Sequence, residues 1–522
     1  MTAARRRAAP GLFLFLFIFI GRPPLVAQPS PLWGSLKAGK YPIGFRTFYR
    51  FEYGRVYKPK VDLTGRAREG ERARPMQISV WYPAAVSRGA SRGVFGRYVE
   101  LLATEEREAK ITDSLRKVAK DLFLKSSHEW LGETPENTAV GRLLNIETAA
   151  VWDADPAAGR FPVIILAQGS SQSAFTHAIL CEYLASYGFV VATSPSMGPQ
   201  GREMPDDLRG AETQERDMEF VIYFLSGGPV ADVTRIGIAG FSFGGNASLL
   251  EAMKNSDVCA VMSMDSNIGY QGALDFLKSD PDFSVERMGL PLLHFSRKDV
   301  PGLDDRLLDT LRYADRTIIR VDGLTHFDFS SYGMITAMVP GFVKSARPNQ
   351  KTGYETLCGY TLAFFREWLT GDKNDHHINE NLDSSARSPG MLMIERKKGE
   401  KGPPSYEEFV DLIRKQGIDR ARELFASERK RVPGASLFQE TTVNRLGYEF
   451  LYSYQSPKTA IEIFRWNVDA YPLSFNVYDS LGESYLAEGR RALAVANYRK
   501  SLELNPGNTN AINVLKRIEA EK

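Results

Sequence analysis

The sequence is poor in the residues that build disulfide scaffolds and metal centres. Its 522 residues include only three cysteines, Cys181, Cys259 and Cys358, and six histidines. Cysteines so few and so far apart exclude a disulfide-built scaffold and a zinc site of the CxxC type, and their odd number leaves at least one thiol free. A multi-histidine centre would need most of the histidines in the chain. The sequence therefore predicts no metal and no cofactor.

An excess of charge of one sign and long apolar runs are also missing. The chain has 66 basic and 63 acidic residues and a formal net charge of +3, which gives no reason to expect a nucleic-acid partner. With 43% hydrophobic and 25% charged residues it has globular composition. Its length favours one large domain plus a further one.

The N-terminal segment has the pattern of a secretory signal peptide. Arg5, Arg6 and Arg7 precede an apolar run over 12–20, and small residues follow up to Ala27. The run is short for a membrane span, which needs roughly 20 apolar residues, although an uncleaved anchor is the alternative. We expect residues 1–27 to be removed, no further membrane segment, and a secreted or periplasmic protein.

Strand-like and helical stretches alternate from about residue 42 to 370. The later strands are continuous apolar runs, which indicates strands buried on both faces of a sheet that helices cover. The pattern predicts an α/β domain over 28–370 with a mainly parallel, eight-stranded sheet. The charged segment 92–146 reads as a helical insertion or cap. The expected strands are 43–49, 77–82, 163–167, 189–193, 235–239, 258–264, 290–295 and 317–321.

The composition changes after residue 370. Residues 371–404 have the polar, Gly-, Pro- and Lys-rich composition of a linker, so we interpret His376 and His377 as solvated loop residues. Residues 405–522 are helical in pattern.

The C-terminal region resembles a tetratricopeptide domain of two repeats with flanking helices. One repeat contains Tyr478, Leu481, Gly482, Tyr485, Ala494, Tyr498 and Pro506, and Ala460, Phe464 and Pro472 lie 34 residues earlier. Such repeats bind peptides or partner proteins. The alternative is a small domain that packs against the rest of the chain and recognises nothing.

The main chemical motif is Gly240-Phe241-Ser242-Phe243-Gly244. It follows an expected strand and precedes an expected helix, the context in which a GxSxG turn exposes a nucleophilic serine. The glycines leave room for the strained turn. A glycine-rich turn of a nucleotide-binding sheet is the alternative, which the order strand, turn and helix disfavours.

A serine needs a base, and in hydrolases with this turn the order along the chain is Ser, then Asp or Glu, then His. His326 follows the last expected strand in a Gly-x-x-His segment and is the predicted base, whereas His294 reads as a core residue. Two acids remain open. Asp265 ends a buried strand, where an unpaired carboxylate would be costly, and Asp299 lies in a later loop.

An oxyanion hole needs two backbone N–H groups. We expect one from Phe243, directly after the serine. The other should come from the loop after residue 166, with Ser170 the first choice and Ser171 the alternative.

Residues 40–370 resemble α/β-hydrolases, specifically the platelet-activating-factor acetylhydrolase and dienelactone hydrolase-like group. The matching segments are Trp81-Tyr82-Pro83, Gln168-Gly169 in place of the family's His-Gly, Tyr187 to Ala192, Gly240 to Gly245, Asp265 and His326. The acetylhydrolase arrangement favours Asp265 as the acid. The dienelactone hydrolase arrangement favours Asp299, but it usually has a cysteine nucleophile, which this chain lacks, so the resemblance implies the triad Ser242, His326 and Asp265. The resemblance implies a serine hydrolase of carboxylic esters, acting on a small ester or lipid. A serine peptidase of the same fold and a non-catalytic protein that binds through its helical repeats are the alternatives.

Overall fold

The computed structural model describes residues 27–62, 65–87, 89–372, 390–432 and 435–520. Nearly all of the predicted signal peptide, and both His376 and His377, lie outside these residues. Among the described residues, no helix is long and apolar enough to cross a membrane. All three cysteines are described and none forms a disulfide.

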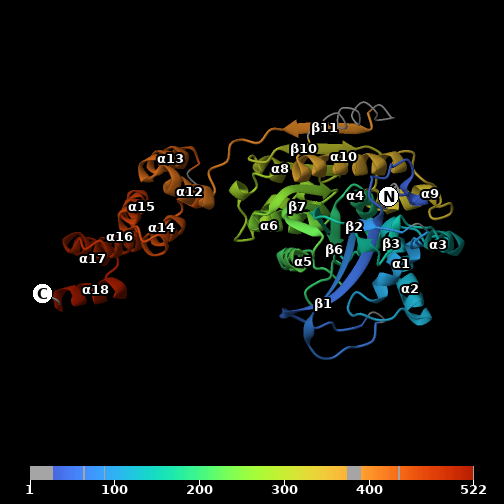
Figure 1. Ribbon diagram of the computed structural model, residues 1–522, viewed down its shortest axis with the longest axis horizontal. Coiled ribbons are helices and arrows are strands. Elements are labelled where there is room, and N and C mark those ends of the chain that lie inside the picture. The colour runs from blue at the N-terminus through green and yellow to red at the C-terminus, as the bar shows by residue number, and fades with distance from the viewer. Residues whose placement is uncertain (1–26, 63–64, 88, 373–389, 433–434, 521–522) are drawn as a thin grey trace, which may run out of the picture.

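A mixed sheet of eleven strands organises the residues before 400 (Figure 1). Its order is β11-β10-β9-β8-β7-β5-β6-β2-β1-β3, and β4 pairs with β2. The strands from β5 to β10 run parallel, whereas β1, β2 and β11 make antiparallel pairs. The bounds are β1 Ile43–Tyr57, β2 Arg72–Ala85, β3 Ala150–Trp152, β4 Asp155–Pro156, β5 Phe161–Ala167, β6 Val190–Thr193, β7 Ala231–Phe241, β8 Val258–Met264, β9 Leu292–Arg297, β10 Arg316–Val321 and β11 Leu392–Lys397.

The expected number of eight strands is therefore corrected to eleven, although the strands at the centre of the sheet are parallel, as expected. Every expected strand is present, but β3, β4 and β11 are added, and the sheet is mixed. The additions are short or lie at the sheet margin, where few apolar residues are needed, so no continuous apolar run marks them.

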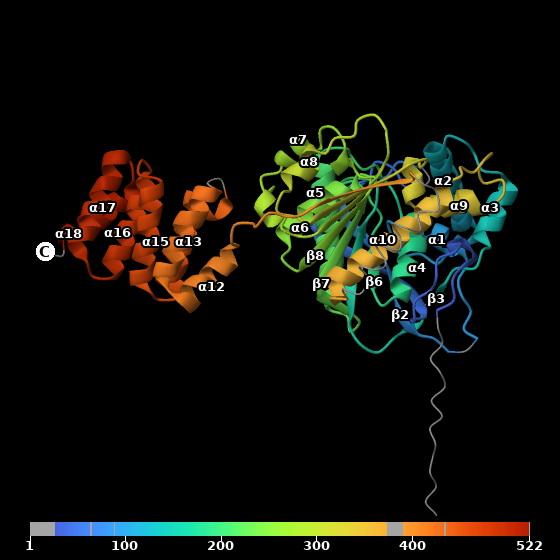
Figure 2. The same cartoon turned by 90° about the horizontal axis from the view of Figure 1, so that it is seen from above.

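The central strands are buried on both faces because helices cover the two sides of the sheet (Figure 2). Ile164 and Leu166 of β5 face a core that includes α4 and α10, and Val163 and Ile165 face a second core with α5 and α6. Alternate side chains of a strand point to opposite faces, so a strand between two cores must be apolar throughout. The helices of this domain are α4 Ala178–Ser186, α5 Leu208–Ser226, α6 Gly244–Lys254, α7 Ala273–Lys278, α8 Arg306–Thr310, α9 Tyr332–Met338 and α10 Gln350–Thr370.

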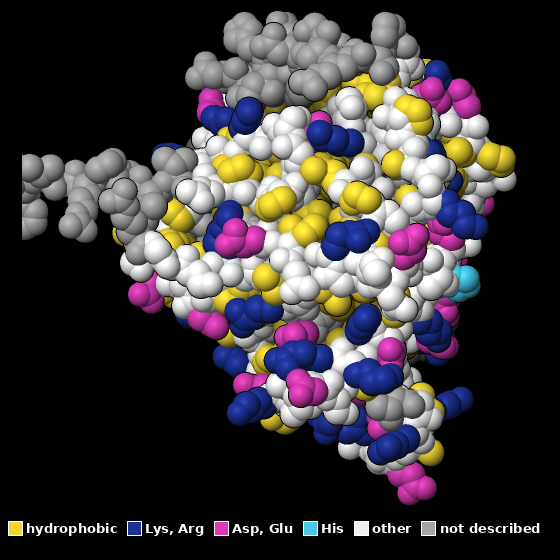
Figure 3. Space-filling view, turned by 90° about the vertical axis from the view of Figure 1, so that its right-hand side faces the viewer, with side chains coloured by type: hydrophobic (Ala, Val, Ile, Leu, Met, Phe, Trp, Pro, Cys, Tyr) yellow, Lys and Arg dark blue, Asp and Glu magenta, His cyan; other side chains and the backbone are white. Residues whose placement is uncertain are grey.

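The segment expected as a helical insertion, 92–146, does form helices. They are α1 Phe95–Glu100, α2 Asp113–Leu131 and α3 Asn137–Leu144. Phe95, Phe123 and Leu143 are buried in the same core as α4 and α10. The face of the molecule on this side carries apolar side chains interrupted by both kinds of charge (Figure 3).

The segment expected as a linker, 371–404, is only partly a connection. Residues 373–389 lie outside the described part, and β11 then pairs antiparallel with all six residues of β10. Gly399 and Glu400 continue the contact, through hydrogen bonds from their N–H groups to Asp315 and Arg312. The sheet domain thus extends to about residue 400.

In the described part of the chain after residue 400, seven α-helices follow, with a core of their own. They are α12 Tyr406–Gln416, α13 Ile418–Arg431, α14 Glu440–Tyr448, α15 Pro457–Ala470, α16 Phe475–Ala487, α17 Arg491–Leu504 and α18 Thr509–Ala520. Their core is made entirely of residues from 406 onward. A β-carbon on Gly482 would lie 3.2 Å from the ring of Tyr498, so a small residue there lets α16 and α17 pack closely.

We predict that a protein ending at Gly402 folds without the helical region. The truncation keeps β11 and both cores of the sheet domain, and separate cores fold independently. Circular dichroism and thermal melting should show a cooperative transition at the temperature of the sheet domain in the full chain. An insoluble product would show that the helices are needed for the sheet domain to fold.

Candidate active site

Ser242 lies on a sharp turn between β7 and α6. Its φ of 54° is in the left-handed region, which non-glycine residues seldom adopt. A β-carbon on Gly240 would lie 2.7 Å from the Gly244 carbonyl oxygen, and one on Gly244 would lie 2.3 Å from that of Ala167. Glycine is therefore required on both sides of the serine, as the motif predicts.

His326 lies in the connection that follows β10, after Gly323, whose φ is 75°. It begins a short 3-10 turn in which Thr325 and Asp328 cap each other, and Arg347 and Gln350 of the following segments bind the Asp328 carboxylate. This backbone is held firmly. It places Nε2 of His326 at 2.9 Å from Oγ of Ser242.

Asp265 directly follows β8 and is 1% exposed. Its Oδ2 lies 2.6 Å from Nδ1 of His326, which completes a hydrogen-bonded chain from the carboxylate to the serine. Two further residues that the sequence did not single out bind the same carboxylate. The Tyr270 hydroxyl donates to Oδ1 at 2.7 Å, and Arg297 donates its backbone N–H at 3.1 Å and its Nε at 2.8 Å.

The surroundings of Asp265 favour its charged form. Burial alone would raise the pKa of Asp265, but the hydrogen bond from His326, the charge of Arg297 and the hydrogen bond from Tyr270 lower it below its usual value. The carboxylate is thus ionised near neutral pH, and it accepts a hydrogen bond from Nδ1 of His326.

The second candidate acid lies apart from this chain of hydrogen bonds. The Asp299 side chain is 82% exposed, and the nearby cation is Lys298 at 3.9 Å. Both aspartates follow strands and both have positive φ, 39° for Asp265 and 53° for Asp299, so these features do not separate them. The hydrogen bond to His326, which Asp265 makes, distinguishes the two aspartates.

The oxyanion-hole candidates have the required free donors. Among the described residues, the backbone N–H groups of Phe243, Ser170 and Ser171 donate to no protein acceptor. The Ser171 hydroxyl donates to the Arg202 carbonyl at 3.1 Å and accepts from the N–H of Met204 at 3.2 Å. A second loop thus braces the loop after β5.

Arg202 also connects this bracing loop to the helical insertion, because its guanidinium pairs with the buried carboxylate of Glu105. The insertion reaches the histidine as well. The Trp130 ring of α2 stacks on Phe327 at 5.3 Å between centroids, and Phe327 meets the His326 ring edge-on at 5.1 Å. Apolar aromatic surface therefore lies beside the imidazole.

Gln168, which stands where the resembling family has histidine, is fully buried and faces another histidine. Its Oε1 accepts from Nδ1 of His177 at 2.8 Å, and its Nε2 donates to the Thr193 hydroxyl at 3.1 Å. Burial, with His326 nearby, lowers the pKa of His177 to about 3, so this imidazole is neutral. His294 is likewise buried, as expected of a core residue, and is hydrogen-bonded to Ser263.

No protein-family model and no curated protein matches the chain. Among solved structures, the chain is similar to a ferulic acid esterase from Streptomyces cinnamoneus. The two share 19% sequence identity with a TM-score of 0.46, and the match covers 69% of this chain and 98% of that chain. The function proposed below therefore depends on the geometry of the site itself.

We predict that neutral, buried His177 makes the protein less stable in acid. The unfolded chain binds a proton at His177 as the pH falls below about 6.5, whereas the folded protein does so only near 3. The free energy of unfolding therefore has its full value above pH 6.5. Below that value it falls by roughly 1.4 kcal/mol for each pH unit, until the folded protein also binds the proton near pH 3.

The test compares urea unfolding of the parent and His177→Asn at pH 7 and pH 5. Asn keeps a donor for Gln168 but does not titrate. The parent should lose roughly 2 kcal/mol more unfolding free energy between the two pH values than the variant does. Equal losses would show that His177 does not titrate in this way.

Proposed function

We propose that this protein is a serine hydrolase of carboxylic esters, with Ser242 as nucleophile, His326 as base and Asp265 as the acid of the triad. The observation that carries the proposal is the continuous hydrogen-bonded chain from Asp265 through His326 to Ser242. The position of Ser242 on a strand–turn–helix elbow, directly before the free N–H group of Phe243, supports the proposal further.

In the proposed reaction, Ser242 Oγ attacks the ester carbonyl carbon and its proton moves to His326 Nε2. The backbone N–H groups of Phe243 and Ser170 bind the oxyanion that forms. The bond to the alcohol oxygen then breaks, and His326 returns the proton to that oxygen, which leaves an acyl-serine. Water attacks the acyl-serine with His326 again as base, and the acid leaves as Ser242 regains its proton.

Asp265 remains ionised throughout this cycle. It holds Nδ1–H of His326 so that Nε2 faces the serine, and its charge stabilises the imidazolium that forms. Tyr270 and Arg297 act through Asp265 as positioning residues, because each fixes the carboxylate by hydrogen bonds.

The proposed substrate is a small ester or a lipid ester. The aromatic surface of Phe327 and Trp130 beside His326 would pack against an apolar part of such a substrate. A serine peptidase remains the second candidate because the same triad cleaves amides. Relative turnover of nitrophenyl esters of increasing chain length and of peptide nitroanilides distinguishes the two.

We further propose that the protein is exported, secreted or periplasmic, on the basis of the basic and apolar pattern of its first 27 residues. The helices from residue 405 onward would act as tetratricopeptide-like repeats that bind a peptide or partner protein. Close packing at Gly482 against Tyr498 supports that interpretation.

Ser242→Ala should abolish esterase turnover, by a factor on the order of 10³ or more, while the fold is retained. The Oγ atom of Ser242 is the nucleophile, and its described hydrogen bond is to His326. A fluorophosphonate should label the parent protein at Ser242 and leave the variant unlabelled. Ser256→Ala, an exposed serine beyond α6, is the matched control. A Ser242→Ala protein that keeps a tenth of the parent turnover would refute the assignment.

Asp265→Asn should reduce turnover of a short-chain nitrophenyl ester by a factor on the order of 10⁴, because the amide can leave the imidazole in the wrong tautomer. Asp299→Asn should change it by less than about tenfold, as expected of an exposed charge. The pair is well matched, since Asn tolerates positive φ at both positions. Circular dichroism confirms folding. A greater loss for Asp299→Asn would move the acid to the loop after β9.

A further inference from the structure

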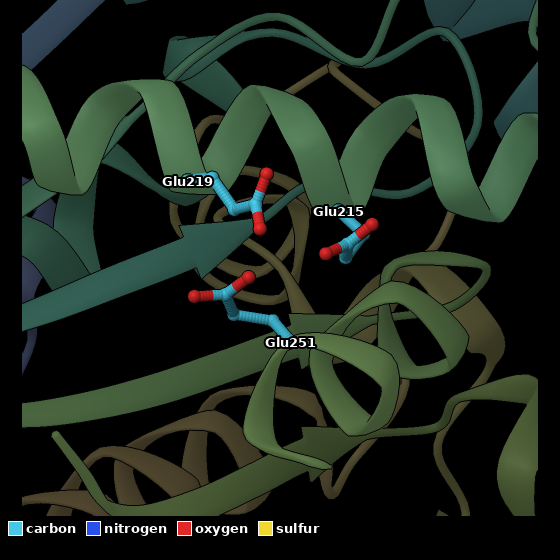
Figure 4. A group of neighbouring side chains, drawn as sticks. All are labelled: Glu215, Glu219 and Glu251. Atoms are coloured by element: carbon cyan, nitrogen blue, oxygen red, sulfur yellow. The ribbon is translucent and has the colours of Figure 1, made fainter. Parts of the chain in front are cut away.

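Three glutamates, none of them a member of the triad, meet between α5 and α6 (Figure 4). Glu215 and Glu219 lie one turn apart on α5, and Glu251 lies near the end of α6. One carboxylate oxygen from each lies within 4.8 Å of the others. Two oxygens bound to one calcium ion at about 2.4 Å can be at most about 4.8 Å apart, so these three fit one coordination sphere.

Two of these carboxylates are buried and incompletely satisfied. Glu215 is 1% exposed and Glu251 is fully buried. Among the described residues, Oε1 of Glu215 and Oε2 of Glu251 have no hydrogen-bond partner, although both atoms are shielded from solvent. A buried carboxylate oxygen without a partner is costly, and in Figure 4 the carboxylates point toward one another.

The neighbouring cation does not balance this charge. Lys254 lies 3.3 Å from Oε2 of Glu215, and it is shared with Asp282 at 3.7 Å. The Asn255 amide binds Oε1 of Glu251. Each buried carboxylate therefore has one oxygen that a neighbour binds and one that no described residue binds. Glu219 is exposed and adds a third negative charge at the open side.

We propose that Glu215, Glu219 and Glu251 bind a divalent cation, and that the cation is Ca²⁺. The ligands are all hard carboxylate oxygens, which suit Ca²⁺, Mg²⁺ and Mn²⁺ and not the softer metals. Ca²⁺ accepts irregular carboxylate cages at 2.3–2.6 Å, whereas Mg²⁺ retains several waters and seldom uses an all-protein site. The exposed side at Glu219 leaves room for water ligands.

The ion would join the helix that follows the nucleophile to its neighbour. Residue 244 begins α6 directly after the elbow, and Glu251 is seven residues further along the same helix. A cation held by α5 and α6 together binds only the folded state, so it stabilises the sheet domain by mass action. Burial raises the pKa of both Glu215 and Glu251 to about 7, so protons compete with the ion in mild acid.

The test uses the full chain, stripped with chelator and titrated with CaCl₂ at pH 8. Isothermal titration calorimetry should show one site. The melting temperature should rise by roughly 5 °C at a hundredfold excess over the dissociation constant, and Mg²⁺ should have a smaller effect. Terbium is a second probe. The exposed Tyr223 side chain lines the same surface cavity as Glu219 and Glu251, so its ring can sensitise the emission of terbium bound there.

Glu219→Gln and Glu251→Gln should each weaken Ca²⁺ binding at least tenfold and so remove about half or more of the thermal shift at the same Ca²⁺ concentration. Glu219 is exposed, so its variant should fold normally. Glu212→Gln, also on α5 but outside the cluster, is the matched control and should behave like the parent.

Two outcomes would overturn the site. The first is the absence of calorimetric binding and of a thermal shift in the parent, which would mean that the carboxylates hold protons instead. The second is a shift that persists in both cluster variants, which would place the ion elsewhere. Ser242→Ala should bind Ca²⁺ like the parent, so this test is independent of the proposed esterase activity.

Discussion

The backbone turn at Ser242 is the constraint on which the rest of the site depends. A residue with positive φ is held between a buried strand and a buried helix, and only glycines fit on either side of it. The turn is also tied to the neighbouring strand, because the Ser242 N–H donates to Met264 and its carbonyl accepts from Asn267. Asp265 and Ser266 are the two residues between Met264 and Asn267. The hydrogen bonds that hold the backbone of Ser242, the proposed nucleophile, therefore also fix the strand end that carries Asp265, the proposed acid.

Much of this arrangement could be predicted from the sequence, because it depends on local rules. Continuous apolar runs mark the parallel strands, and the motif around Ser242 requires glycines that the geometry explains. The choice between Asp265 and Asp299 could not be made from local pattern, since both follow strands and both adopt positive φ. They differ in the contact that Asp265 makes with His326, 61 residues further along the chain, which only the tertiary fold specifies.

Other features were missed for related reasons. β11 has a polar, edge-strand pattern inside a segment of linker composition, and its pairing with β10 is a long-range interaction. Arg297 carries no local sequence signal that marks it as a site residue. It binds Asp265 because β8 and β9 are adjacent, so their carboxyl ends meet at one edge of the sheet. This adjacency is a property of the strand order, which the sequence alone does not specify.

The pairing of β11 with the sheet also determines how far the helical region can move from the sheet domain. Since Gly399 and Glu400 are still hydrogen-bonded to the sheet domain, only residues 401–405 remain as a tether before α12. Five extended residues reach about 18 Å. A molecule held on the helices would thus share a small volume with the sheet domain, and a tether this short corresponds to an effective concentration on the order of millimolar. Even weak recognition by the helical region would then keep its target close to the proposed active site.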